Sequence, residues 1–299
     1  MTRRATRGRS FDDGRGAALP VETLDNFLGR TMALANRWHE VGDAPMRRVI
    51  CAPTTPTFSL DPGELSEIAQ AARARGLRLH SHLSENGDYA AMTLAQTGQR
   101  PVPWVAERGW LGEDVFFAHL VDCTHDEVTM LAQSGTAMAH CPQANARLGS
   151  GVAPAAALHG LSGTVSLAVD GAAANEAADM VQALYAAFCH QRTASGAQAV
   201  AAETVLHWAT TGGARALGMP GLGRIAPGMA ADLCLWDLSQ PRFMGQIDAA
   251  IGPIVSGGAG ALRHSFVAGR PLVVDGRLPD LDLGQLGRDA ARVTARMAA

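Results

Sequence analysis

Short apolar runs alternate with longer helix-type segments through most of the chain. The runs include residues 76–79, 117–118, 137–139 and 165–169, at intervals of roughly 20 to 40 residues. The segments between them, such as 124–133 and 154–159, have helical character. Short buried strands that alternate with helices are typical of β/α units around a parallel sheet. The pattern therefore predicts an α/β fold.

Each of these strands ends in an ionisable side chain. The first run leads into His80 and His82, and the later runs lead into His119, His140 and Asp170. One histidine after an apolar run is usually a core residue, but successive strand ends favour a shared site. Because the carboxyl ends of parallel barrel strands meet on one face, we expect these side chains to gather there.

The segment 80–85, HSHLSE, is the most specific of these strand ends. Side chains alternate along a strand, so His80 and His82 should lie on the same face, and Glu85 follows just past the strand end. Imidazoles with a nearby carboxylate can activate water on a metal, the carboxylate handling the proton. The alternative is a polar strand end with a capping acid. We interpret the segment as part of a hydrolase site.

The remaining pattern divides the chain in two. Helices are expected over 21–40, 61–75, 88–97, 102–108, 177–191 and 202–217, a strand over 48–53 followed by a turn at 54–56, and a loop over the arginine-rich first 18 residues. From residue 223, turn residues lead into an apolar strand and a hairpin over 265–276 without intervening helices, and a helix over 283–297 closes the chain. We predict a partial barrel domain over 1–222, and a β-sandwich segment with a closing helix over 223–299.

Composition narrows the class of protein. Hydrophobic residues make up 47% of the 299 residues and charged residues 18%, which suits a globular enzyme. The net charge of −3 gives no reason to expect a nucleic acid or an anionic membrane as partner. The five cysteines are scattered without CxxC spacing, and no apolar run reaches membrane-spanning length, so we expect no disulfide framework and a cytoplasmic location.

Several motifs give the chain a family resemblance. They are HLSE at 82–85, His119, HCPQAN at 140–145, RLGSG at 147–151, VDGAAANE at 169–176 and PGMAADL at 227–233. In order and spacing the chain resembles the amidohydrolase superfamily, within the group of guanine, cytosine and 8-oxoguanine deaminases and chlorotriazine hydrolases. The segments 46–49, 52–55, 80–85, 175–180 and 250–253 are most similar to isoxanthopterin deaminases.

The resemblance implies a (β/α)8 barrel of the amidohydrolase type with a small β-sandwich, and a role for each residue. It makes His82 and Asp170 ligands of one zinc ion, with Fe²⁺ as the alternative metal. It makes Glu85 the carrier of the water proton and Asp170 the second proton carrier. It makes His119 a hydrogen-bond partner of the attacking oxygen or of the developing tetrahedral centre. A zinc ion lowers the pKa of its water to roughly 7.

Other residues near these motifs receive weaker assignments. We expect His80 to serve in packing or behind the ligands. His140 and Asn145 are expected to organise the next loop or to reach substrate, and Asn175 and Glu176 to order the loop of Asp170.

One departure from the family pattern matters. Family members carry a His-x-His ligand pair on the first barrel strand, whereas the only histidine here before His80 is His39. We therefore expect a chain that is truncated at its amino end, lacking about three of the eight strands of such a barrel.

Three functions stay open. The first is deamination of a 2-amino-4-oxo heterocycle, an isoxanthopterin-like pterin, with release of ammonia. The second is a related reaction on 8-oxoguanine, a thioadenosine or a chlorotriazine. The third is an inactive fragment that lacks the first-strand ligands. For the intact family member we expect a small heterocyclic substrate and a homo-oligomer.

Overall fold

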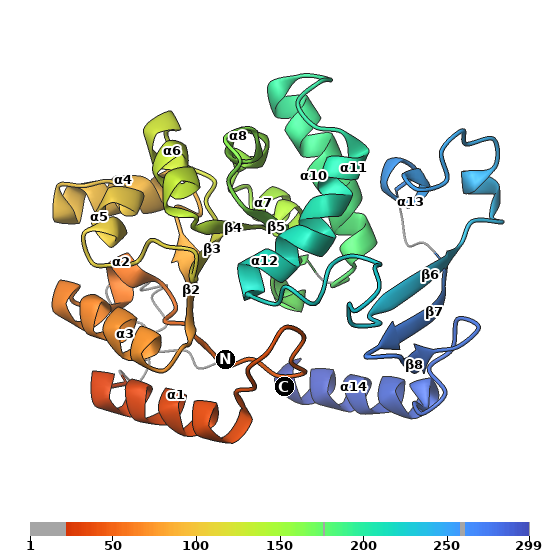
Figure 1. Cartoon of the computed structure of the whole chain (residues 1–299), viewed down its shortest axis with the longest axis horizontal. Coiled ribbons are helices and arrows are strands. Elements are labelled where there is room, and N and C mark those ends of the chain that lie inside the picture. The colour runs from red at the N-terminus through yellow and green to blue at the C-terminus, as the bar shows by residue number, and fades with distance from the viewer. Residues whose placement is uncertain (1–21, 176, 258–260, 299) are drawn as a thin grey trace.

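The larger sheet consists of parallel strands joined by helices. The computed structural model describes residues 22–175, 177–257 and 261–298. Within them, the sheet order is β1-β2-β3-β4-β5, every neighbouring pair is parallel, and chain order equals spatial order. The strands are β1 (Ile50–Cys51), β2 (Arg78–Leu83), β3 (Val115–His119), β4 (Ala137–His140) and β5 (Val165–Leu167). This is the succession of β/α units that the apolar runs predict (Figure 1).

Helices fill the connections between these strands. They are α1 (Leu24–Trp38), α2 (Pro56–Ser59), α3 (Pro62–Ala74), α4 (Gly87–Thr97), α5 (Pro101–Ala106), α6 (His125–Ser134), α7 (Pro142–Arg147), α8 (Ala155–Gly160), α9 (Ala172–Asn175), α10 (Met180–Ser195), α11 (Ala202–His207), the π-helical turn η1 (Trp208–Gly212) and α12 (Gly213–Leu217). Local chemistry sets their ends. Helix α6 begins with a capping box of Thr124 and Glu127 and ends at Gly135 in a left-handed conformation.

A second, antiparallel sheet follows in the chain. Strands β6 (Leu233–Asp237), β7 (Ala261–Val267) and β8 (Arg270–Val273) pair in that order. The short helices η2 (Pro241–Phe243) and α13 (Gly252–Val255) lie between β6 and β7, and α14 (Leu283–Ala298) follows β8. In Figure 1, α10, α11 and α12 stand between the two sheets.

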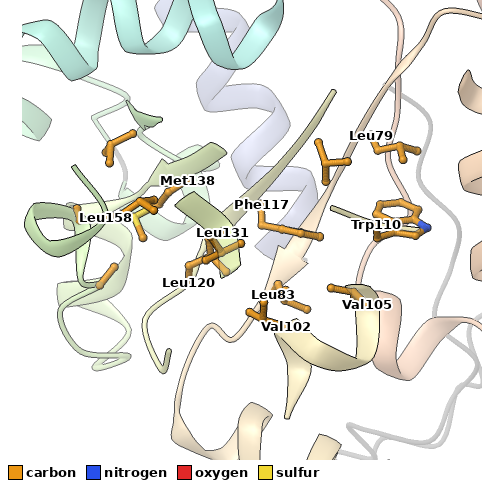
Figure 2. Packing of buried hydrophobic residues seen from close by; sticks show 14 of the residues in the cluster. Leu79, Leu83, Val102, Val105, Trp110, Phe117, Leu120, Leu131, Met138 and Leu158 are labelled. Atoms are coloured by element: carbon orange, nitrogen blue, oxygen red, sulfur yellow. The ribbon is translucent and has the colours of Figure 1, made fainter. Parts of the chain in front are cut away.

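The hydrophobic core packs the strands of the larger sheet against their helices. Leu79, Leu83 and Phe117 from β2 and β3 are fully buried, as are Leu131 of α6 and Trp110 (Figure 2). Burying one such side chain stabilises the fold by about 1.5–3 kcal/mol. Trp110 also donates its Nε1–H to the carbonyl of Leu65 in α3, at 2.7 Å, so its one polar atom is satisfied. These contacts hold the strands whose ends carry the ionisable residues.

The sequence places most elements correctly, and the differences have local causes. The strand expected at 76–79 begins at Arg78 and runs on to Leu83, because the β2–β3 pairing extends through Leu83. The turn expected at 54–56 leads into α2, with Pro56 in its first turn. The helix expected from residue 177 begins at Met180, where the side chain of Asp179 caps it.

The helix expected over 202–217 is interrupted by η1. Gly212 at the end of this turn lies so close to β5 that an added Cβ would clash with the carbonyl oxygen of Val165. A residue without a side chain is therefore required for this approach. The loop expected over the first 18 residues lies outside the described residues. The division into domains at residues 222 and 223 stays a prediction.

Candidate functional site

The ionisable strand ends lie along one edge of the larger sheet. His119 and His140 are the last residues of β3 and β4, His82 precedes the last residue of β2, and Asp170 follows β5 by three positions. In the parallel register Leu83 lies opposite His119, and His140 lies opposite Leu167. Because all five strands run in the same direction, these residues share the carboxyl edge.

The ring of His82 is held by a hydrogen bond to the segment that follows β1. Its Nδ1 lies 2.8 Å from the carbonyl oxygen of Thr54, just after β1. A carbonyl oxygen can only accept, so Nδ1 carries the proton and, in the neutral ring, the lone pair is on Nε2. Metal-binding histidines are commonly held in this way, with the second ring nitrogen donating to a carbonyl or carboxylate.

His119 connects His82 with Asp170. Its ring stacks on that of His82, with centroids 5.4 Å apart and an interplanar angle of 26°. On its other side, His119 Nε2 lies 4.0 Å from Oδ2 of Asp170. Its Nδ1 lies 2.9 Å from Oδ1 of Asn145, in α7. The structure therefore brings His82, His119 and Asp170 into one group, and adds Asn145 to it.

The backbone at this edge adopts conformations that are unfavourable for L-residues. The φ angles are +48° at Ser84, +72° at His119, +51° at Leu120 and +65° at Asp170. Such left-handed residues cost of order 1–3 kcal/mol each and concentrate at functional sites. Asp170 also accepts a hydrogen bond from the backbone N–H of Gly171 at 2.7 Å, which fixes one carboxylate oxygen.

Glu85 lies two residues beyond β2 and is half-buried. The pKa of the thiol of Cys141, the residue after β4, is raised to about 12, mainly by burial and also by the negative charges of Asp170 and Glu85. The role of Glu85 as the proton carrier stays a prediction.

His80 lies behind this group. It is on the same face of β2 as His82, as strand alternation predicts, with ring centroids 6.1 Å apart. Its ring stacks on Phe116 at 4.3 Å, and its Nδ1 lies 3.0 Å from the carbonyl oxygen of the same residue. These contacts with β3 are those of a packing residue.

His140 and Asn145 are both 1% exposed, and each has an unpaired polar atom. Nδ1 of His140 and Nδ2 of Asn145 have no hydrogen-bond partner, and Nε2 of His140 lies 3.4 Å from Nε2 of Gln191. Burial, followed by the charges of His190 and His119, lowers the pKa of His140 to about 3. His140 is therefore neutral at physiological pH.

The loop after Asp170 is tied to its strand by Asn175. Its side-chain Nδ2 donates to the carbonyl of Val169, and its Oδ1 accepts from the N–H of Ala178 at 2.7 Å. These bonds agree with the expected ordering role of Asn175. Glu176, to which the same role is assigned, lies outside the described residues.

The His82 imidazole and the Asp170 carboxylate are of the chemical types that bind zinc, but a zinc site needs more ligands than these two. An imidazole held through Nδ1 and a carboxylate are both zinc ligands. Within residues 22–175, 177–257 and 261–298, however, no group of three or more His, Cys, Asp or Glu side chains could hold a metal ion. The described residues therefore contain no complete metal site, and the assignment of His82 and Asp170 as zinc ligands stays a prediction.

A cavity of about 480 Å³ lies elsewhere, at the opposite end of the strands. Its lining includes Arg78 and Ala137, the first residues of β2 and β4, and Thr164, just before β5. The amino ends of barrel strands carry stability more often than chemistry. We therefore place the functional site at the carboxyl edge, although this cavity lies at the other end of the strands.

Two contacts of the site have no signal in the sequence. The acceptor for His82 is a backbone carbonyl, which any residue at position 54 would present. The partner of His140 is Gln191, near the C-terminal end of α10, a position at which the sequence shows only an ordinary helical residue.

Comparison with known proteins assigns the chain to one family. The sequence pattern of the amidohydrolase family matches residues 25–273, and the chain belongs to this family. It is 41% identical over 98% of its length to isoxanthopterin deaminase of an unknown prokaryotic organism, and 34% identical over 98% to 8-oxoguanine deaminase of Pseudomonas aeruginosa. It spans 64% and 66% of the lengths of these two relatives.

Solved structures give the same result. An amidohydrolase from an environmental sample of the Sargasso Sea superimposes with a TM-score of 0.85 and 40% identity, over 99% of this chain and 65% of the other. A zinc-bound adenosine deaminase from Xanthomonas campestris gives 0.88 and 29%, over 94% and 64%. A zinc complex of atrazine chlorohydrolase from Arthrobacter aurescens gives 0.88 and 28%, over 97% and 64%. The expected amidohydrolase-type α/β fold is confirmed.

Among the described residues, no helix combines the length and the apolar character that a membrane span requires.

Proposed function

We propose that this chain carries the proton-transfer half of a metal-dependent aminohydrolase site, which acts on a 2-amino-4-oxo heterocycle resembling isoxanthopterin. In this reaction water adds to the ring carbon that bears the amino group, the C–N bond breaks, and a ring carbonyl and ammonia form. The observation that supports it best is the grouping of His82, His119 and Asp170 at the carboxyl edge.

Each residue has a stated task in this proposal. His82 and Asp170 would hold the zinc ion, which when bound supplies a water molecule of lowered pKa. Glu85 takes a proton from the attacking water and delivers it to a ring nitrogen, which makes the adjacent carbon more electrophilic. His119 faces the developing tetrahedral centre, and Asp170 passes the second proton to the leaving amine.

The substrate class rests on similarity. The relative at 41% identity is an isoxanthopterin deaminase, and the relative at 34% is an 8-oxoguanine deaminase. Both names describe fused bicycles with an amino group beside ring nitrogens. The second candidate is therefore the purine 8-oxoguanine. Hydroxydechloroatrazine ethylaminohydrolase of Pseudomonas sp., at 32% identity, supports a triazine less strongly.

A chimera tests the proposal. In it, this chain replaces the matching part of the isoxanthopterin deaminase relative. Ammonia release is measured with isoxanthopterin, 8-oxoguanine and a thioadenosine, and chloride release with a chlorotriazine. We expect turnover that is highest with isoxanthopterin. A folded chimera that contains zinc but releases ammonia from none of these compounds would overturn the proposal.

Variants of the same chimera test the roles. Glu85→Gln keeps the shape and removes the proton carrier, so turnover should fall by roughly 10²- to 10⁴-fold while zinc stays bound. Asp170→Asn should lower zinc content as well. Near-normal turnover of Glu85→Gln would show that another group moves the proton.

A further inference from the structure

The contact between Asn145 and His119 has a feature that packing alone does not explain. Both side chains are 1% exposed, and the Nδ1 of His119 lies 2.9 Å from Oδ1 of Asn145. The other amide atom of Asn145, Nδ2, is buried without a hydrogen-bond partner. A buried unpaired donor costs about 1–3 kcal/mol, so an apolar residue would serve packing better at this position.

The backbone around Asn145 is fixed on both sides. Its N–H donates to the carbonyl of Cys141 at 2.9 Å, and its carbonyl accepts from the N–H of Ser150 at 2.8 Å. The amide group is therefore presented from a held position in α7. It meets a ring whose own residue has a φ of +72° at the end of β3. Two strand ends are joined here by one side-chain contact.

The Nε2 atom and one face of the His119 ring are directed at Asp170 and His82. Its Nε2 lies 4.0 Å from the carboxylate of Asp170, and its face stacks on His82. Any turn of the ring would change both distances. An acceptor at Nδ1 also selects the tautomer, because a proton on Nδ1 leaves the lone pair on Nε2.

We propose that Asn145 is a positioning residue, whose Oδ1 accepts the Nδ1–H of His119 and thereby fixes the ring orientation and the tautomer that Nε2 presents to the site. Asn145 acts through His119 and does not itself touch the reacting atoms. The inference rests on the proposed function only where it assigns the Nε2 of His119 a part in the reaction. The hydrogen bond and the tautomer belong to the protein with or without activity.

Nitrogen NMR of the full chain tests this directly. The protein is labelled with ¹⁵N-histidine and freed of metal with a chelator, and His119→Gln identifies the two ring signals of His119 by their loss. We expect the wild-type ring to carry a proton on Nδ1. A proton on Nε2 instead would mean that Asn145 donates through Nδ2, and would overturn the proposal without any further variant.

Two substitutions separate positioning from packing. Asn145→Leu removes the acceptor at similar volume, and we expect the Nδ1 signal of His119 to move from the protonated to the unprotonated range. Asn145→Asp retains an oxygen acceptor and should keep Nδ1 protonated. An unchanged His119 signal in folded Asn145→Leu would contradict the proposal.

The matched control is Gln143→Leu in the same helix. Gln143 donates to Oε1 of Gln182 in α10 at 3.2 Å. We expect wild-type ring signals in this variant. If Gln143→Leu moved the His119 signal as far as Asn145→Leu does, the effect would come from α7 as a whole and the proposal would fail. Failure of the deamination assay would leave these spectra unaffected, so the two proposals are tested separately.

Discussion

Burial decides the charge of His140. Its side chain is 1% exposed beside Gln191 and edge-on to the ring of Trp208. Loss of solvation, followed by the charges of His190 and His119, lowers its pKa from 6.5 to about 3. The folded protein therefore keeps this ring neutral over a pH range in which the unfolded chain binds a proton.

This difference predicts acid sensitivity. The folded pKa is depressed below the unfolded value, so between pH 6.5 and 3 the unfolded state binds the additional proton and stability falls as the pH falls. From pH 7 to pH 5 we expect His140 to lower the free energy of unfolding by about 2 kcal/mol. Urea denaturation at both pH values measures it.

His140→Gln is the control for that measurement. Burial also lowers the pKa of His39, His159 and His190, so the wild-type slope contains several contributions. Only the difference between wild type and His140→Gln reports on His140. Equal pH slopes for the two proteins would show that His140 is protonated in the folded state.

Among the elements, the β7–β8 hairpin carries a strained turn residue. Ala268 and Gly269 connect the strands with φ angles of +49° and +77°. Positive φ at both central residues is typical of a type I′ turn, which favours Asn-Gly. The turn is nevertheless well anchored, because the N–H of Ala268 donates to Oδ1 of Asp232 at 2.7 Å.

Replacing this alanine should stabilise the protein. A left-handed conformation costs an ordinary L-residue roughly 1–2 kcal/mol, and asparagine tolerates it better. We expect Ala268→Asn to raise the free energy of unfolding by about 1 kcal/mol, and the β-branched Ala268→Val to lower it. Thermal denaturation followed by circular dichroism provides the measurement. The same melting temperature for all three proteins would contradict the turn assignment.

A partly buried ion pair joins α5 to α6. The carboxylate of Glu127, 2% exposed, accepts from Nε of Arg100 and from the N–H of Thr124, both at 2.8 Å. Nη2 of Arg100 donates to the carbonyl of Asp122 at 2.8 Å. Three segments that frame the β3 strand end are tied together by these two side chains.

Removing the cation should be costly. Arg100→Met leaves the carboxylate of Glu127 buried without its counter-charge, and we expect a loss of about 3 kcal/mol in the free energy of unfolding, measured in urea. Arg292→Met in α14 breaks an exposed pair with Asp289 and should change stability by less than about 0.5 kcal/mol. Equal effects of the two substitutions would rule out a special role for burial.

At the scale of the whole molecule, the number of metal ligands is the decisive quantity. Catalytic zinc sites generally combine three protein ligands with an open position. In the part of the chain that the structure describes, no group of three donor side chains could hold a metal ion, and the proposed ligands are His82 and Asp170.

Weak zinc binding is the expected result. After dialysis, the purified 299-residue chain should hold well below one zinc ion per molecule by elemental analysis. The chimera with the isoxanthopterin deaminase relative should hold close to one, and Asp170→Asn should reduce that content. Stoichiometric zinc on the chain alone would show that a further residue completes the site.

The sequence predicts much of the fold because the signals involved are local. Helix α3 could be placed from Asp61, Pro62 and the capping glutamate Glu64, and α14 from its apolar spacing. The interruption of the helix over 202–217 could not be foreseen. At this turn Gly212 lies against Val165 of β5, which is 47 positions earlier in the sequence.

For the site, the sequence by itself determined which side chains stand at the strand ends. The two-residue period of a strand puts His80 and His82 on one face, and the parallel direction of the strands puts His82, His119 and Asp170 at one edge. Only the tertiary structure decided the states of these groups. The proton position on His82 depends on a carbonyl 28 residues away, the orientation of His119 on an amide 26 residues away, and the charge of His140 on burial by α10 and Trp208. Hydrogen-bond partners and loss of solvation are set by residues that are distant in the chain, whereas strand periodicity and turn chemistry are set by neighbours.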